Sequence, residues 1–319
     1  MKESPGKAEN TMSRFSKADF WLYLFLLPLY FAVWGKFGQK FAAGAVISMA
    51  TGVFCWFVAL VLCSPPENKE FSEKTFAWPL FALFPLFCPL GLPLWLIPFI
   101  LIISYLVAIT CFGGYGRHFF NPVALAVVFM VCGYSNTASL SATRPLPPTN
   151  SGYKTWSAGM PAAKPLWRIY ESVSSARLVE ASVSGALPAI PGHAFGLPLL
   201  LASFCMSFVF AHRRLWWLAA VAGTALFAFV CSKYSVMVIS PAHPLLLGIV
   251  PGLLLIAIAD FSTLPESPLE QVLGGLIFAA LALLFIVKSD NALGPVFAFL
   301  LAQVLLPLLT DLTKKWSRK

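Results

Sequence analysis

Charged residues are scarce in this chain. Only 11% of its 319 residues are charged, whereas 59% are hydrophobic, and the mean hydropathy is +0.80. A soluble domain carries about 25% charged residues. The composition therefore excludes a soluble globular enzyme and predicts an all-α integral membrane protein, because helices satisfy their own backbone hydrogen bonds in lipid.

Closely spaced cysteine pairs are also missing. The seven cysteines are Cys55, Cys63, Cys88, Cys111, Cys132, Cys205 and Cys231, and none forms a Cys-x-x-Cys motif. Single cysteines in or beside apolar stretches indicate packing rather than a disulfide framework or a metal site. We therefore predict no bound metal.

Acidic residues are few, at 13 against 22 Lys and Arg, which leaves a net charge of +9. The basic residues cluster between apolar runs. This pattern is typical of a membrane topology signal and not of a nucleic-acid-binding surface.

Ten apolar stretches can be recognised between the charged segments. A spanning helix needs about 17–25 residues. The predicted spans are 20–34, 41–63, 75–90, 92–112, 123–139, 193–211, 215–232, 236–259, 271–287 and 292–312. They divide the chain into an N-terminal segment (1–19), a first five-helix half (20–139), a polar loop (140–192), a second five-helix half (193–312) and a basic tail (313–319).

The distribution of Lys and Arg predicts the orientation of these spans. With both ends in the cytoplasm, thirteen basic residues lie in cytoplasmic segments and four in short outside loops, while five more lie in the polar loop. Cytoplasmic loops of membrane proteins carry an excess of positive charge. We therefore expect cytoplasmic termini and an extracytoplasmic polar loop.

Prolines interrupt the third span of each half. They run from Pro79 to Pro93 in the first half and from Pro241 to Pro251 in the second. A duplicated unit of five spans must sit inverted relative to its partner, so the pattern predicts two inverted repeats with broken helices around a cavity, as in many transporters. The alternative is that the prolines only kink packed helices.

A glycine-rich turn lies between the fourth and fifth spans. Gly113, Gly114 and Gly116 permit positive φ angles. Asn121 and Pro122 then suit the N-cap and N1 positions of a helix. Amides exposed at a helix start favour an anionic or polar ligand, although a tight turn between helices explains the same residues.

Asp260 ends the most interrupted span of the second half. A carboxylate at a membrane boundary can bind a cation, relay a proton or cap a helix. In the polar loop, three stretches of small residues (141–143, 157–160 and 184–188) have the composition of loops.

Several of these segments resemble one family. Residues 113–122, GGYGRHFFNP, resemble the GGxGxNxFNPA signature of RnfD and NqrB, membrane subunits of the Rnf complex and of the sodium-translocating NADH:quinone reductase. Residues 240–260 resemble the family's SP…LL.G…ATDP stretch at the same spacing, and residues 294–311 its final GVMFAILL…APLID helix. His118 replaces an asparagine and Val123 an alanine, so the chain is similar to a divergent member. Its short polar N-terminus and its length favour RnfD over NqrB.

The resemblance implies a role in electron transport. The family's subunits pass electrons through bound flavin, in a bacterial inner-membrane complex that couples redox chemistry to Na⁺ or H⁺ movement. Other membrane subunits are then the expected partners, with ferredoxin or NADH as the electron donor. The implied cofactor-binding residues are Gly113, Gly114, Gly116, Asn121 and Pro122. Asp260 is implied in ion handling.

The resemblance also implies FMN joined through its phosphate to a threonine of an SGAT-like motif. The closest match, at 184–188, has Leu187 at that position, and leucine has no hydroxyl to form the bond. Met160 fails in the same way. Thr143 follows Ser141 and Ala142 and is the one weak covalent candidate. We therefore expect FMN or riboflavin to be bound non-covalently or to be absent. Two alternatives stay open, a secondary transporter for a small solute and a flavin-free scaffold subunit.

Overall fold

The computed structural model describes residues 5–63, 78–112, 118–134, 143–147, 152–157, 174–234, 242–289 and 291–317. Within these ranges the secondary structure is helical, apart from an isolated antiparallel bridge between Thr143 and Ala189. The helices are α1 (Pro5–Phe37), α2 (Gln39–Cys63), η1 (Trp78–Phe87), α4 (Leu96–Tyr105), η2 (Leu106–Thr110), α5 (Pro122–Gly133), α7 (Ser175–Ser184), η3 (Pro191–Phe195), α8 (Gly196–Val209), η4 (Ala211–Arg213), α9 (Arg214–Lys233), α10 (His243–Leu246), α11 (Ile249–Ala259), η5 (Phe261–Thr263), α12 (Pro268–Lys288) and α13 (Gly294–Ser317). The predicted all-α class is confirmed.

Six helical segments among the described residues are long and apolar enough to cross a membrane. They are Asp19–Phe37, Gln39–Ala59, Pro191–Val209, Ala211–Lys233, Pro268–Lys288 and Gly294–Lys315. Each matches one of the ten predicted spans. A multi-pass membrane protein is thereby confirmed.

The other four predicted spans correspond to shorter helices. Three apolar helical segments of 10–17 residues, Leu96–Thr110, Pro122–Gly133 and Ile249–Ala259, are too short to cross a bilayer as single straight helices. The fourth, η1, is a 3₁₀ helix with Pro85 inside it. The count of ten spans and the inverted repeat therefore stay predictions.

Both segments in which prolines predict an interruption are indeed broken. The first segment consists of η1 followed by an irregular stretch through Pro93. In the second segment, Leu247 and Gly248 interrupt the helix between α10 and α11. Gly248 has a φ of +77°, and a Cβ there would lie 2.1 Å from the carbonyl oxygen of His193. Because only glycine combines this conformation with such a close approach, Gly248 determines where the helix breaks.

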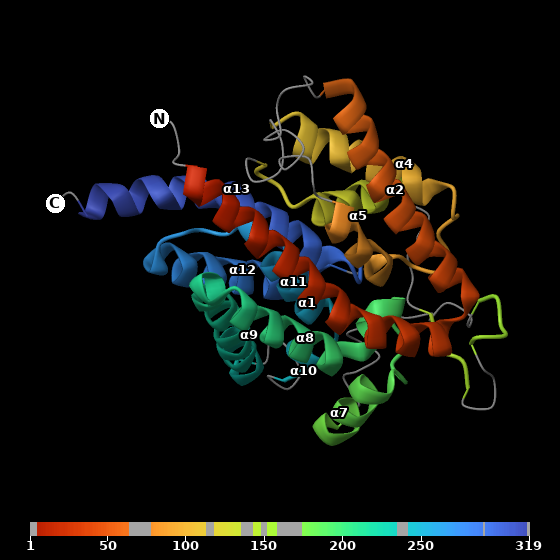
Figure 1. Cartoon of the computed structure of the whole chain (residues 1–319). Coiled ribbons are helices and arrows are strands. Elements are labelled where there is room, and N and C mark those ends of the chain that lie inside the picture. The colour runs from red at the N-terminus through yellow and green to blue at the C-terminus, as the bar shows by residue number, and fades with distance from the viewer. Residues whose placement is uncertain are drawn as a thin grey trace.

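The core of the molecule lies around α11. Every residue of α11 is buried, and the helix contacts α1, α5, α8 and α13 as well as η1. Figure 1 shows α11 in the middle of the molecule, with α1 and α13 passing over it. Since η1 and α5 belong to the first half and α11 to the second, the two halves share one core.

The first two helices diverge from their junction like the arms of a V (Figure 1). The junction is Gly38, which has a φ of +97°. A Cβ at this position would lie 2.9 Å from the carbonyl oxygen of Thr155. The backbone amides of Gln39 and Lys40 donate to the carbonyls of Thr155 and Trp156, so the segment 152–157 covers the turn.

Candidate functional site

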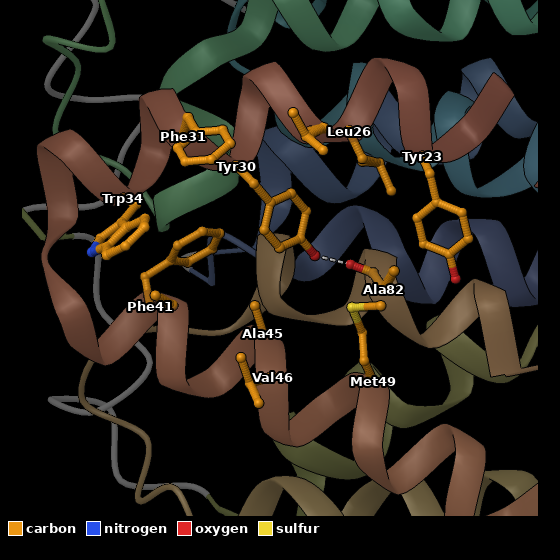
Figure 2. Close-up of a pocket in the computed structure, with 12 residues that line it drawn as sticks. Tyr23, Leu26, Tyr30, Phe31, Trp34, Phe41, Ala45, Val46, Met49 and Ala82 are labelled. Carbon is orange, nitrogen blue, oxygen red and sulfur yellow. Dashed lines mark hydrogen bonds between the residues drawn. The ribbon is translucent and has the colours of Figure 1, made fainter. Parts of the chain in front are cut away.

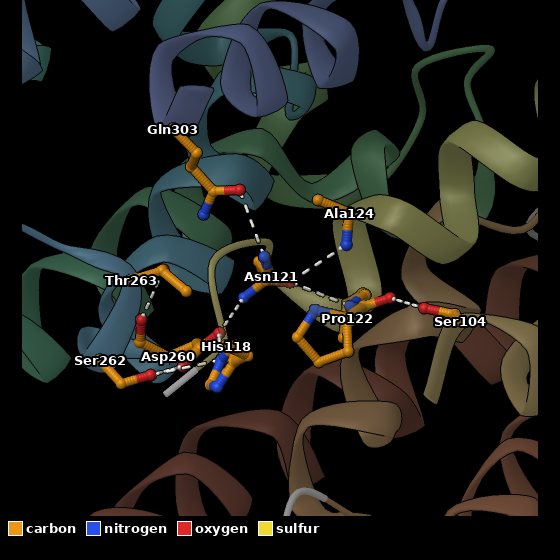
Figure 3. Close-up of polar contacts among 10 residues, drawn as sticks. Ser104, His118, Asn121, Pro122, Ala124, Asp260, Ser262, Thr263 and Gln303 are labelled. Carbon is orange, nitrogen blue, oxygen red and sulfur yellow. Dashed lines mark hydrogen bonds and ion pairs between the residues drawn. The ribbon is translucent and has the colours of Figure 1, made fainter. Parts of the chain in front are cut away.

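Asn121 and Asp260 lie in direct contact, although 139 residues separate them in the chain. Asn121 precedes α5 and Asp260 follows the last residue of α11. The Nδ2 atom of Asn121 donates to Oδ2 of Asp260 at 2.9 Å, and both residues are 0% exposed. The structure therefore brings together two of the residues that the sequence singled out (Figure 3).

Asn121 caps α5 as predicted. Its Oδ1 atom accepts hydrogen bonds of 3.0 Å from the backbone amides of Val123 and Ala124, and Pro122 occupies the first helical position. The backbone amide of Asn121 donates to Oε1 of Gln303 at 3.2 Å. Each polar atom of the Asn121 side chain thus has a partner within the protein, so this residue organises the helix start and does not present a free amide to a ligand.

His118 is the second contact of the Asp260 carboxylate. Its Nε2 atom lies 2.9 Å from Oδ2 of Asp260, and both side chains are 0% exposed. Removing a carboxylate from water costs on the order of several kcal/mol unless it is paired and hydrogen-bonded. The imidazole supplies such a partner. His118 was noted in the sequence only as a departure from the family signature, yet it reaches the same carboxylate as Asn121.

Ser262 completes the shell around the carboxylate. Its hydroxyl donates to Oδ1 of Asp260 at 2.7 Å and lies 3.3 Å from Nε2 of His118. Thr263 donates its hydroxyl to the backbone carbonyl of Asp260 at 3.0 Å. Both residues belong to η5, so the turn that follows α11 folds back onto its own final carboxylate. Sequence reasoning missed Ser262, although its position two residues after Asp260 was a usable local signal.

Gln303 joins α13 to the same cluster. The residue is 2% exposed, and its Nε2 atom has no hydrogen-bond partner among the described residues. The amide orientation is consistent, because Oε1 must face the backbone donor of Asn121. A single glutamine inside an apolar helix gives no local sign of such a partner, and the sequence analysis did not select it.

The cluster of His118, Asn121, Asp260, Ser262 and Gln303, here called the Asp260 cluster, is a polar island in the core. It connects the turn before α5, the end of α11 and the middle of α13 (Figure 3). On its far side, the hydroxyl of Ser104 on α4 donates to the carbonyl of Pro122. A change of charge at Asp260 would therefore be felt by helices of both halves.

Gly113, Gly114 and Gly116 lie outside the described residues. Their predicted role at a ligand stays a prediction. Within the described ranges, no group of three or more His, Cys, Asp or Glu side chains gathers as a metal site would require.

Thr143, the weak candidate for covalent FMN, is engaged in backbone pairing. Its amide and carbonyl exchange 3.0 Å hydrogen bonds with Ala189. Its hydroxyl also donates to the carbonyl of Ala189, at 3.3 Å, and the residue is 6% exposed. A hydroxyl held in this way does not fit a phosphoester link to a cofactor.

Leu187, which stands at the threonine position of the SGAT-like motif, is a packing residue. It is 4% exposed and lies in a small apolar cluster with Leu178, Leu246 and Leu247. This cluster joins the polar loop to the end of α10. The residues at the expected attachment point therefore do not fit a covalently bound flavin.

A groove lies between α1 and α2. It encloses about 490 Å³ and is lined by aromatic and aliphatic side chains, among them Phe31, Trp34 and Phe41. Figure 2 shows Ala82 of η1 at its floor, where its carbonyl accepts a hydrogen bond from the Tyr30 hydroxyl. The rings offer stacking surfaces, but the almost wholly apolar lining does not fit the polar edge of a flavin, which needs hydrogen-bond partners.

Comparisons with known proteins agree with the resemblance found in the sequence. The model of the NQR2, RnfD, RnfE family matches residues 7–318. A comparison with curated proteins found no match. The matched range includes every residue of the Asp260 cluster.

Proposed function

This chain belongs to the NQR2, RnfD, RnfE family, and from that membership we propose that it is a membrane subunit of a complex that couples electron transfer to the movement of Na⁺ or H⁺. The six membrane-length helices support this placement. In the proposed arrangement, both termini face the cytoplasm of a bacterium and the other membrane subunits of the complex are the partners. The lipid bilayer covers the apolar helix faces.

The observation that carries the proposal is the Asp260 cluster. An ionisable residue inside a membrane protein is costly to bury and marks an ion pathway or a relay by default. Asp260 contacts the turn before α5 through His118 and Asn121, and Asn121 in turn contacts α13. A carboxylate with these partners is suited to convert a change of charge into a shift between helices, which is what ion coupling requires.

Any flavin in this proposal is bound non-covalently. When bound, FMN or riboflavin would supply one- and two-electron transfer. The packing of Leu187 and the hydrogen bond of the Thr143 hydroxyl both argue against a covalent link. No step of ion coupling at Asp260 depends on where such a flavin sits.

A flavin-free scaffold subunit is the second candidate. The observation that favours it is that Leu187 uses the expected attachment point to pack against α7 and α10. In this reading the subunit keeps its place in the complex and its ion pathway, while other subunits carry the electrons.

The first experiment concerns the cofactor. The chain is purified, its visible spectrum is recorded, and it is then precipitated with acid. Flavin in the supernatant supports non-covalent binding, and a colourless protein supports the scaffold reading. Flavin that remains on the precipitated chain would contradict both.

The second experiment concerns ion coupling. The complex is reconstituted in vesicles, and donor-driven ion movement is compared for the wild type and Asp260→Asn. The substitution keeps the shape of the side chain but removes its charge, so we expect electron transfer to continue while ion movement is lost. Glu180→Gln, at an exposed position of α7, is the matched control and should behave as wild type. Normal ion movement in Asp260→Asn would refute the role of this carboxylate.

A further inference from the structure

We propose that the ion handled at Asp260 is a proton, exchanged at the contact between His118 Nε2 and Asp260 Oδ2, and that His118 is the residue that determines this choice. The inference rests on the proposed function and names the ion that the proposed function leaves open. It is carried by the chemistry of the groups that surround the carboxylate.

The surroundings of Asp260 are rich in hydrogen-bond donors. The carboxylate contacts the side-chain nitrogens of His118 and Asn121 at 2.9 Å and the hydroxyl of Ser262 at 2.7 Å. The cluster also contains the Nε2 amide group of Gln303, which has no partner among the described residues. Donor groups turn their positive ends inward, which suits an anion and opposes a metal cation.

Among the described residues around Asp260, oxygen ligands for a metal cation are correspondingly scarce. Hard cations such as Ca²⁺ and Mg²⁺ take about six or more oxygen ligands. The other side-chain oxygens of the cluster already have partners, because Asn121 Oδ1 caps α5 and Gln303 Oε1 accepts from the Asn121 amide. Thr263 directs its hydroxyl at the backbone carbonyl of Asp260. Recruiting Asn121 Oδ1 or Gln303 Oε1 as a sodium ligand would break the N-cap of α5 or the contact with α13.

A proton needs none of these changes. Histidine is the side chain that exchanges protons in the physiological range, and its nitrogen already lies at hydrogen-bond distance from the carboxylate. With the proton on His118, imidazolium and carboxylate together carry no net charge. When the proton leaves, one negative charge remains in a site that is 0% exposed, held by Asn121 and Ser262. This uncompensated charge is costly, so loss of the proton weakens the contacts that hold the surrounding helices at the carboxylate.

No second titratable partner competes for the proton among the described residues that contact Asp260. From α13 the cluster receives Gln303, from η5 it receives Ser262 and Thr263, and from the start of α5 it receives Asn121. None of these exchanges a proton in the physiological range. Among these contacts, His118 is therefore the group that can exchange a proton with Asp260.

The experiment uses the complex in vesicles that contain a pH-sensitive dye and a sodium indicator. Electron transfer is started by the reduced donor, with and without Na⁺ in the medium. We expect proton movement that does not depend on Na⁺. We expect His118→Asn, which keeps a polar side chain but cannot carry the proton, to lose proton movement while electron transfer continues. His212→Asn, at an exposed histidine, is the matched control and should leave proton movement unchanged.

Two outcomes would overturn the inference. One is sodium movement in step with electron transfer. The other is proton movement that persists in His118→Asn. An absence of donor-driven movement of either ion in the wild-type complex would instead refute the proposed function, so the two failures can be told apart.

A measurement on the wild-type chain covers the case in which His118→Asn does not assemble. The chain has only four histidines, so ¹⁵N-labelled histidine gives few imidazole signals. We expect the His118 signal to stay unchanged when Na⁺ is added at constant pH. A His118 signal that shifts when Na⁺ is added would overturn the proton assignment.

Discussion

Replacing Asn121 by alanine removes two different interactions at once. The side chain accepts two backbone hydrogen bonds at the start of α5 and donates one to Asp260. Loss of an N-cap costs about 0.5–2 kcal/mol, and loss of a hydrogen bond to a charged group costs about 1.5–3 kcal/mol. The sum predicts that Asn121→Ala lowers the free energy of unfolding by about 2–5 kcal/mol.

Asn121→Ser separates the two contributions. Serine is also a strong N-cap residue, but its side chain is too short to reach Asp260 while capping. We therefore expect Asn121→Ser to recover the capping part, about 1 kcal/mol relative to alanine, and to keep the loss at the carboxylate. In an Asp260→Asn background, the proteins with Asn121 and with Asn121→Ser should differ less in their free energy of unfolding. The reason is that the charge-assisted hydrogen bond is already gone.

The assay is equilibrium unfolding of the purified chain in mixed micelles, followed by tryptophan fluorescence. The chain has ten tryptophans, so the signal reports on most of the molecule. If the Asn121→Ala and Asn121→Ser variants both unfold at the same denaturant concentration as the wild type, the buried hydrogen bonds of Asn121 contribute nothing to stability. The idea that this residue holds α5 against α11 would then be wrong.

Two further predictions use the same unfolding assay. A left-handed residue with a Cβ costs about 1–2 kcal/mol. Gly248→Ala should destabilise the chain by more than this, because the new atom would also lie 2.1 Å from the His193 carbonyl oxygen. Gly133→Ala, at the last residue of α5 and with nothing within 4 Å of its Cβ, is the control and should leave the stability close to that of the wild type. Equal stability of the two alanine variants would show that the break before α11 does not need glycine. Leu187→Thr should destabilise the chain by about 1–3 kcal/mol, because it places an unpaired hydroxyl among leucines. The variant should also acquire no flavin. Added flavin mass on the intact variant would contradict the view that residue 187 is a buried packing position.

The apolar stretches and the proline breaks could be predicted from the sequence because both depend on neighbouring residues. Six of the predicted spans are helices of membrane length. The stretch 75–90 shows the limit of the method, because hydropathy measures how apolar a segment is and not whether its prolines permit one straight helix. There the chain forms η1, a short 3₁₀ helix with a proline inside.

In the candidate site, too, contacts between near neighbours in the chain could be predicted and long-range contacts could not. The N-cap of Asn121 was predictable because its acceptor bonds reach only two and three residues along the chain. The contact of Asn121 with Asp260 was not, because the two positions are 139 apart in the chain. Gln303 gave no signal at all, since a single amide in an apolar helix shows its partner only when another helix packs beside it.

By itself the amino-acid sequence determined that this chain is a helical membrane protein, where its helices break and which side chain begins α5. Those features follow from hydropathy, proline geometry and capping, which act between near neighbours. Only the tertiary structure decided that His118, Asn121 and Ser262 surround the carboxylate of Asp260, because a buried polar group takes its partners from whichever helices pack against it. That packing depends on the whole molecule and not on near neighbours in the chain.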